Sequence, residues 1–194
     1  MEEFYNYLSD SLSKSEIDQL SKFLVEKRIG KGEILLQAGS VCNHSFFVEE
    51  GLLRSFSIDK QGKEHVIQFA PENWIISDRS SLLFQEPSEF FIDAVENTTL
   101  IMFDEEFVVK ASELSAKYRS FNQKALNNHI RHQQRRINRL LSATAEERYL
   151  NFIQLYPNIT LRVPQWMIAS YLGITPESLS RVRKELARKN FIPG

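Results

Sequence analysis

Residues 162–192, RVPQWMIASYLGITPESLSRVRKELARKNFI, decide the fold of the C-terminal part of the chain. The stretch predicts two short helices joined by a tight turn. Pro164 is expected at the first position of the first helix, where its missing N–H costs nothing. Gly173 supplies the turn, because glycine tolerates the left-handed backbone that ends a helix. Thr175 is expected to cap a second helix that begins at Pro176. The pattern predicts a helix–turn–helix.

The second predicted helix has two faces of different chemistry. Leu179, Val182 and Leu186 recur at helical spacing and are expected to face the core. The opposite face is polar and is expected to be exposed; it carries Glu177, Ser180, Arg181 and Lys184. An arginine fork fits the O6 and N7 acceptors of guanine, and a glutamate accepts from the N4 amine of cytosine. Because Glu177 and Arg181 are one turn apart, they can contact adjacent base pairs.

These features favour DNA recognition over an ordinary amphipathic helix with a solvated Glu–Arg pair. The pair alone is common, but turn, caps and charged face together are specific. The side chains expected to contact bases or phosphates are Glu177, Ser180, Arg181, Thr175, Ser178, Arg183, Lys184 and Gln165. Arg188 and Lys189 are further candidates for phosphate contacts.

The distribution of charge supports the same interpretation. The whole chain has 24 basic and 25 acidic side chains, and a net charge of −1. Residues 1–106 hold nine basic and 20 acidic groups (net −11), whereas residues 107–194 hold 15 basic and five acidic groups (net +10). The asymmetry indicates a half that binds a polyanion, joined to an acidic half. Its affinity for DNA should depend on salt.

Composition limits the class of protein. The 194 residues suffice for one large domain or two small ones. Cys42 is the only cysteine, so no intrachain disulfide can form and a reducing cytosol fits. No long apolar run or signal-peptide pattern is present, which indicates a cytoplasmic protein without membrane association. The four histidines are scattered, so we expect no metal ligand and no cofactor.

The first half predicts an antiparallel β-barrel or sandwich. Short runs rich in Ile, Val, Phe and Leu alternate with turn signals, as in residues 32–40, 44–76 and 89–103. Residues 59–62 predict a hairpin between strands at 53–58 and 64–69. A short helix is expected over residues 15–25, before the first strand.

From about residue 105 the pattern is helical. One short helix is expected over residues 107–114, one long helix over residues 118–141, and another over residues 146–155. The apolar positions of the long helix form only a partial seam, which does not by itself establish a coiled coil and also fits simple packing on the barrel. Residues 159–163 are expected to form a short strand beside the helix–turn–helix. The expected domains are 1–115 (barrel), 116–141 (dimerisation helix) and 142–194 (DNA binding).

This order of elements resembles the Crp/Fnr family of bacterial transcription regulators over nearly the whole chain. The stretches that carry the resemblance are GEILLQAGS (32–40), FFVEEGLLRSFSIDKQGKEHVIQF (46–69) and MIASYLGITPESLSRVRKEL (167–186). The resemblance implies an α+β fold: a cyclic-nucleotide-binding-like jelly roll, a dimerising long helix and a C-terminal winged helix. In the Fnr branch, a Glu-x-x-Ser-Arg set contacts the bases. That set falls here on Glu177, Ser180 and Arg181, and implies half-sites of the TTGA type.

The chain departs from the family at the expected nucleotide site. Cyclic-nucleotide binders of the family carry a Gly-Glu-Leu turn and an Arg-Ser or Arg-Thr pair for the phosphate. Here Ile76 and Ser77 replace the Gly-Glu turn, and Glu89 falls near the position of the phosphate arginine. A buried carboxylate there would repel a phosphate. We therefore expect no control by cyclic AMP. Arg54 and Arg79 are the candidate contacts for another anionic effector, with plain surface solubility as the alternative.

Two further departures concern the sensor and the wing. The four-cysteine sensor of the Fnr branch is absent, because Cys42 stands alone. The sequence stops at Gly194, before the hairpin that completes the family's wing, so a reduced wing is expected. The resemblance implies as partners a palindromic double-stranded DNA site, a second copy of the chain bound through the long helix, a small-molecule effector and RNA polymerase.

Two other classes of function compete with a DNA-binding regulator. One is an effector-sensing interaction module that uses its helix–turn–helix for protein contact; the basic charge of that half argues against it. The other is an enzyme. The sequence contains no GxSxG, HExxH, P-loop or CxxC pattern, and Glu49 and Glu50 are adjacent strand residues that face opposite sides. We expect no catalytic residue.

Overall fold

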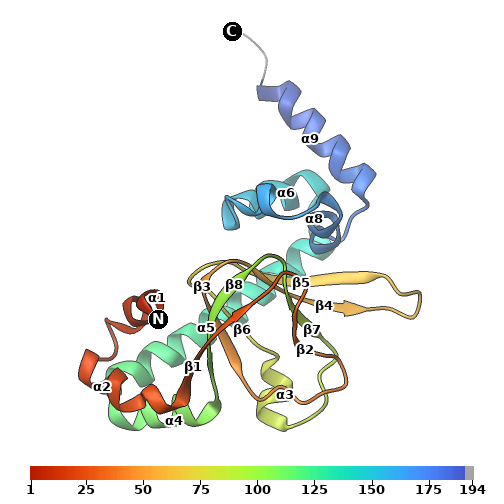
Figure 1. Ribbon diagram of the computed structural model, residues 1–194. Coiled ribbons are helices and arrows are strands. Elements are labelled where there is room, and N and C mark those ends of the chain that lie inside the picture. The colour runs from red at the N-terminus through yellow and green to blue at the C-terminus, as the bar shows by residue number, and fades with distance from the viewer. Residues whose placement is uncertain (191–194) are drawn as a thin grey trace. The chain divides into compact units, whose positions relative to one another are not determined.

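The computed structural model describes residues 1–190, and it divides into two compact units. The first unit comprises Met1–Lys63 and Ile67–Asn128, and the second comprises Glu64–Val66 and the chain from His129 onward. Figure 1 shows the strands of the first unit and the helices that follow them in the sequence. Residues 191–194, the last of the expected DNA-binding domain, lie outside the described residues.

Eight strands form two four-stranded antiparallel sheets, which confirms the predicted all-antiparallel architecture. One sheet has, in order, β1 (Leu24–Ile29), β8 (Thr98–Phe103), β3 (Ser45–Glu50) and β6 (Ile75–Ile76). The other has, in order, β2 (Ile34–Leu36), β7 (Phe91–Ala94), β4 (Leu53–Ile58) and β5 (Glu64–Ala70).

The central strand β3 is apolar on both faces because each face meets a separate core. Phe46 and Val48 lie in a cluster between the sheets, whereas Phe47 lies in a second cluster beneath helices. Successive strand residues point to opposite faces, so a continuous apolar run is needed where both faces are buried. The helices over the second cluster are α1 (Glu2–Leu8), α2 (Lys14–Leu20), α4 (Glu105–Leu114) and the start of α5 (Ala116–Ser142).

The expected helix over residues 15–25 was too long. A capping box between Ser13 and Glu16 starts α2, which ends at Leu20 and is followed by one 3-10 turn. Leu24 then pairs with Phe103 in the β1–β8 ladder. Tertiary pairing overrides the helical spacing of the apolar residues there. The sequence prediction also missed α1, whose Phe4 is buried in the helix-covered core.

The predicted hairpin is confirmed. The Asp59 side chain accepts hydrogen bonds from the backbone N–H groups of Gln61 and Lys63, at 2.9 and 3.0 Å. Gly62 has a φ of 79°, which lies in the left-handed region that favours glycine. The turn is therefore fixed by Asp59 and Gly62, two residue types that are typical of turns and can be read from the sequence.

The long helix α5 runs from Ala116 to Ser142 without interruption, close to the predicted limits. Tyr118 is buried and Phe121 packs against the helix-covered core of the first unit. Farther along, Ile130 and Ile137 are 55% and 57% exposed. Packing on the barrel thus accounts for the first turns of α5 only.

The described part of the C-terminal region is entirely helical. Its elements are α6 (Ala145–Leu155), α7 (Ile159–Arg162), α8 (Gln165–Leu172) and α9 (Pro176–Asn190). Phe152, Tyr156 and Tyr171 form its aromatic core, with ring centroids 5.3 to 5.8 Å apart. The strand predicted over residues 159–163, and with it the remaining wing strand, is wrong. Ile159 is buried in a helical turn, and within residues 1–190 no strand follows β8 to pair with one here.

Gly51 tests how tightly the first unit is built. It has a φ of 103°, and an added Cβ would lie 2.5 Å from Thr98 Oγ1 and 2.6 Å from the Asn97 carbonyl oxygen. We expect Gly51→Ala to destabilise the fold by roughly 3 kcal/mol, from backbone strain plus steric overlap. The matched control is Gly62→Ala, where φ is 79° but no atom lies within 4 Å, and the cost should be about 1 kcal/mol. Urea unfolding measures both; equal midpoints would contradict the steric argument.

Candidate nucleic-acid interface

The turn between α8 and α9 has the predicted geometry. Gly173 adopts the left-handed conformation, with φ 65° and ψ 37°, and its N–H bonds to the carbonyls of Ala169 and Ser170. The N–H of Ile174 returns to the Ala169 carbonyl at 3.0 Å. One detail differs from the prediction: Pro164 is the N-cap of α8 and not its first residue, because its ψ of 150° is extended.

Two arginines hold the C-terminal end of α8. Arg136, from α5, donates from Nη2 to the Tyr171 carbonyl at 3.0 Å and lies 4.4 Å from the centroid of the Tyr171 ring. Arg148, from α6, donates from Nη1 to the Leu172 carbonyl at 2.7 Å. Carbonyls in the last turn of a helix lack partners within it, and cations are favoured there. Neither arginine was predicted from the sequence, because neither belongs to a motif and each donates to a carbonyl 24 or more positions away.

Thr175 caps α9 as predicted. Its Oγ1 accepts from the Ser178 N–H at 3.2 Å, and its carbonyl accepts from the Leu179 N–H at 3.0 Å. Hydrogen bonds from the N–H of Glu177 itself and from the Thr175 hydroxyl hold the pKa of the Glu177 carboxyl below its ordinary value. Glu177 therefore stays ionised, as an acceptor for a base amine requires.

The sequence-predicted side chains gather largely on one exposed surface. Leu179 and Val182 are buried and Leu186 is half-buried, so α9 turns its apolar side inward. The opposite side of α9, which we call the recognition face, carries Glu177, Ser180, Arg181 and Lys184, all exposed. Among the other candidates, Thr175, Arg183 and Gln165 are exposed and Ser178 is half-buried.

One candidate phosphate contact is engaged within the protein. The Lys189 ammonium, near the end of α9, lies 2.7 and 2.9 Å from the two carboxylate oxygens of Glu146 on α6. The pair connects two helices of the second unit and raises the pKa of Lys189 through its hydrogen bond to Glu146. Lys189 is less available to DNA than the exposed Lys184.

The other candidate residues lie in the barrel, where Arg54 is buried. Its Nε and Nη2 donate to the two carboxylate oxygens of Asp93 at 2.8 and 2.9 Å, and the guanidinium stacks 4.1 Å from the Phe56 ring. Arg54 and Asp93 are only 5% and 9% exposed. The alternative of a solvated surface arginine is therefore wrong for Arg54. Asp93 already provides the anion that this fork would bind.

The segment around α3 (Arg79–Phe84) contains a second internal anion. The Asp78 carboxylate caps α3, accepting from the N–H groups of Ser80 and Ser81 at 3.1 and 3.2 Å. It also accepts from the Ser88 hydroxyl at 2.7 Å. Arg79 is half-buried at the first position of α3. Glu89 is exposed, so the expectation of a buried, phosphate-repelling carboxylate at that position is wrong.

Comparison with known proteins agrees with this architecture. The family model described as "Cyclic nucleotide-binding domain" matches residues 26–113. The fumarate and nitrate reduction regulatory protein of Vibrio cholerae is 27% identical over 187 residues, covering 89% of this chain and 73% of the relative. Electron transport regulator A of Shewanella oneidensis is 25% identical over 194 residues, covering 94% and 77%.

Solved structures share the fold. FixK2 from Bradyrhizobium japonicum has a TM-score of 0.73 at 18% identity, with 88% of each chain covered. A transcriptional regulator of the Crp/Fnr family from Eubacterium rectale has a TM-score of 0.70 at 18% identity, covering 97% of this chain and 91% of that one. At these identities the likeness concerns the fold.

The fold and the relatives define a transcription regulator that joins a cyclic-nucleotide-binding-type barrel to a helix–turn–helix. Over most of its length the chain is similar to regulators of the Crp/Fnr type. Its relatives are regulators and not enzymes, as the sequence predicted. No helix within residues 1–190 is long and apolar enough to cross a membrane.

The Thr175 cap gives a test of local order at the interface. Thr175→Val removes the side-chain acceptor of the Ser178 N–H, and we expect it to cost about 1 kcal/mol of stability. It also removes a hydrogen bond to Glu177, so the pKa of Glu177 should rise toward its ordinary value of 4.5. Thermal unfolding and NMR titration of the carboxyl measure the two effects. Ser180→Ala, an exposed hydroxyl loss on the same helix, is the control and should change neither.

Proposed function

We propose that this protein is a homodimeric, sequence-specific DNA-binding regulator that acts on a palindromic site without control by cyclic AMP. The observation that carries the proposal is the recognition face of α9. Glu177 and Arg181 are exposed and adjacent on it, behind a turn fixed by Gly173 and two arginines. This arrangement supports direct contact with base edges in the major groove, with Lys184 and Arg183 on phosphates.

The exposed side of α5 supports dimerisation by a second copy. Leu126, Ile130, Gln133, Ile137 and Leu140 follow one another at spacings of four, three, four and three residues, the spacing of a coiled-coil seam. The two isoleucines are more than half exposed, which is costly for large apolar side chains in water. An identical helix would cover them, and the polar Gln133 inside the seam would favour one register.

The proposed division of labour follows the expected domains: residues 1–115 as an effector barrel, 116–141 as the dimerisation helix and 142–194 as the DNA-binding domain. The structural units divide inside α5, after Asn128, which agrees with a helix that contributes to both. A small-molecule effector and RNA polymerase are further proposed partners, and the bacterial cytosol is the proposed location.

Two carboxylates support independence from cyclic AMP. A cyclic phosphodiester needs a cation and free backbone N–H donors at close quarters. In this barrel the Asp93 carboxylate is paired with the buried guanidinium of Arg54, and the Asp78 carboxylate accepts hydrogen bonds from the N–H groups at the start of α3. The residues present therefore do not fit the phosphate of a cyclic nucleotide, because it would meet two anions where it needs donors.

Selection of random duplex DNA on the purified protein tests the DNA-binding part of the proposal. The wild type should enrich a palindrome with TTGA-like half-sites whose centres lie about 34 Å apart, one helical turn. The double variant Glu177→Ala, Arg181→Ala should lose this preference but keep weak, salt-sensitive binding, because phosphate contacts remain.

The matched control is Lys184→Gln, which should weaken binding to all sequences alike and reduce the salt slope by about one. A double variant that still enriched the same palindrome would show that the recognition face is wrongly assigned. Affinity independent of salt would instead favour a protein-contact role for the helix–turn–helix.

Calorimetric titration tests the independence from cyclic AMP. We expect no micromolar binding, since Asp78 and Asp93 fill the positions that a phosphate requires. The same preparation must bind its selected duplex, which shows that the sample is folded and active. Micromolar binding of cyclic AMP, or enrichment of a DNA site only in its presence, would overturn this part of the proposal.

A further inference from the structure

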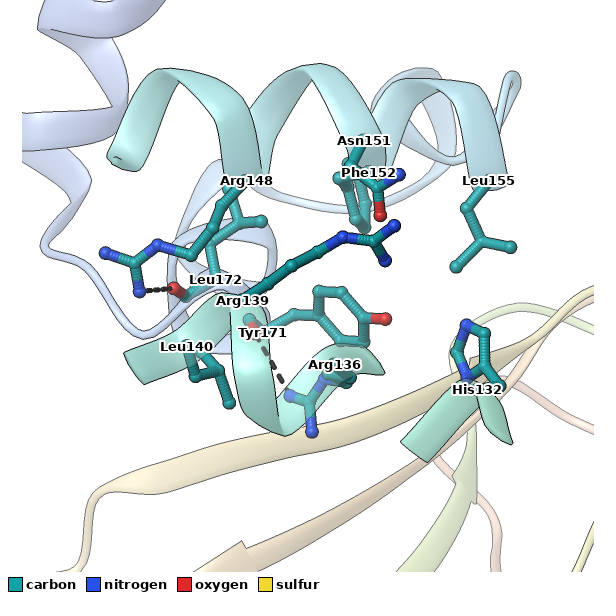
Figure 2. A pocket seen from close by; sticks show the side chains of 10 residues that line it. All are labelled: His132, Arg136, Arg139, Leu140, Arg148, Asn151, Phe152, Leu155, Tyr171 and Leu172. Carbon is teal, nitrogen blue, oxygen red and sulfur yellow. Dashed lines mark hydrogen bonds between the residues drawn. The ribbon is translucent and has the colours of Figure 1, made fainter. Parts of the chain in front are cut away.

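A small cavity lies inside the second unit, between the last turns of α5 and the helices α6 and α8 (Figure 2). Its polar lining residues are His132, Arg136 and Arg139 from α5, Arg148 and Asn151 from α6, and Tyr171 from α8. The remaining lining residues are apolar. Three arginines and one histidine therefore line the space, and none of the lining residues within 1–190 is a carboxylate. We call this space the arginine pocket.

Only some of the guanidinium donors in the arginine pocket form hydrogen bonds with the protein. Arg136 and Arg148 each donate to a carbonyl at the end of α8, as described above. Their Nε atoms are buried, and within residues 1–190 neither has a hydrogen-bond partner. Buried polar atoms without partners are uncommon in proteins and point to a missing acceptor.

Arg139 is the side chain that the fold does not account for. It is half-buried, and its guanidinium extends into the space between α5 and α6, whereas Arg148 points to the Leu172 carbonyl (Figure 2). Within the described part of the chain, the Arg139 side chain forms no hydrogen bond or ion pair, whereas its backbone carbonyl accepts from the Ala143 N–H at 3.0 Å. A guanidinium presents five donors, so several remain available for an anion.

The surroundings of His132 show the sign of the local field. Burial is the largest effect that lowers the pKa of His132, and the charges of His129, Arg136, Arg139 and Arg135 lower it further. Burial opposes a charge of either sign, but the neighbouring cations oppose protonation of the imidazole and favour a negative charge. The geometry and the field therefore agree.

We propose that the arginine pocket binds a small free oxyanion of the phosphate class, through Arg139 and His132 on α5 and Asn151 on α6. The cavity volume of about 30 Å³ sets the size of the ligand. It exceeds the ~10–15 Å³ that one water needs but is far below the ~300 Å³ of pockets for drug-sized ligands. A tetrahedral oxyanion fits this range, and a nucleotide does not.

Such an anion would connect the last turns of α5 to α6 within the second unit. It would offset the repulsion among Arg136, Arg139 and Arg148, the first and last of which hold the turn before α9. Because only the folded unit presents the pocket, the anion would also raise stability in proportion to its occupancy. The site goes beyond the proposed function, since binding of the ion needs no DNA.

The test is calorimetric titration of the full-length protein with inorganic phosphate, at ionic strength held constant with sodium chloride. We expect saturable binding that Arg139→Gln weakens about ten-fold or more, because a charge-assisted hydrogen bond is lost. Arg135→Gln is the matched control: it removes the same charge from the same helix, at an exposed position outside the pocket lining. It should leave binding nearly unchanged.

NMR titration of His132 in the wild-type protein gives a second test that does not depend on the folding of a variant. In the wild-type protein, phosphate should raise the pKa of His132, because a bound anion favours the imidazolium. Equal weakening by Arg139→Gln and Arg135→Gln, or an unchanged pKa of His132 at saturating phosphate, would overturn the proposal.

A second arm separates a free ion from a phosphate of the DNA backbone. The salt slope of duplex binding should be the same for Arg139→Gln and Arg135→Gln if the ligand is a free ion. A slope reduced by about one for Arg139→Gln alone, without binding of inorganic phosphate, would assign the pocket to the DNA backbone and overturn the free-ion proposal.

Discussion

The direction of the recognition helix depends on how α8 ends. A helix leaves its last carbonyls without partners, and here Arg136 and Arg148 supply donors for two of them while Gly173 reverses the chain. The arginines come from α5 and α6, so the turn is held from outside the motif. A helix–turn–helix that was closed only by its own residues could pivot at Gly173. Here hydrogen bonds from α5 and α6 also hold the end of α8, and so help to position the recognition face.

Internal partners also satisfy charged and polar groups in the barrel. Two of its carboxylates are held by donors of the fold itself: Asp93 by the guanidinium of Arg54, and Asp78 by the N–H groups that start α3. A buried ion pair contributes little net stability over an apolar pair, but loss of one partner costs several kcal/mol. Both sets of donors are therefore satisfied by carboxylates of the barrel itself. An anionic effector that used these donors would have to displace a carboxylate.

What the sequence could predict was local. The Gly173 turn, the Thr175 cap, the Asp59 hairpin and the long helix each rest on residues a few positions apart, and all are confirmed. The failures were non-local. Arg54 and Asp93 are 39 residues apart, so no pattern along the chain pairs them. Likewise the helical turn at Ile159 and the end of α2 before β1 depend on which partner strand exists, and periodicity carries no information on that.

The charge asymmetry of the chain takes a different form in each unit. In the acidic half, the buried guanidinium of Arg54 meets the Asp93 carboxylate at hydrogen-bond distance, so the charges of this pair are balanced inside the fold. In the basic half, Arg139 lines a pocket with no carboxylate among the described lining residues, and the charges of Arg183, Lys184 and Arg181 face solvent. Like charges at close range repel one another, and an anion from outside would reduce that repulsion. DNA phosphates could balance the exposed charges of the recognition face, and a small oxyanion could balance the partly buried charges of the arginine pocket.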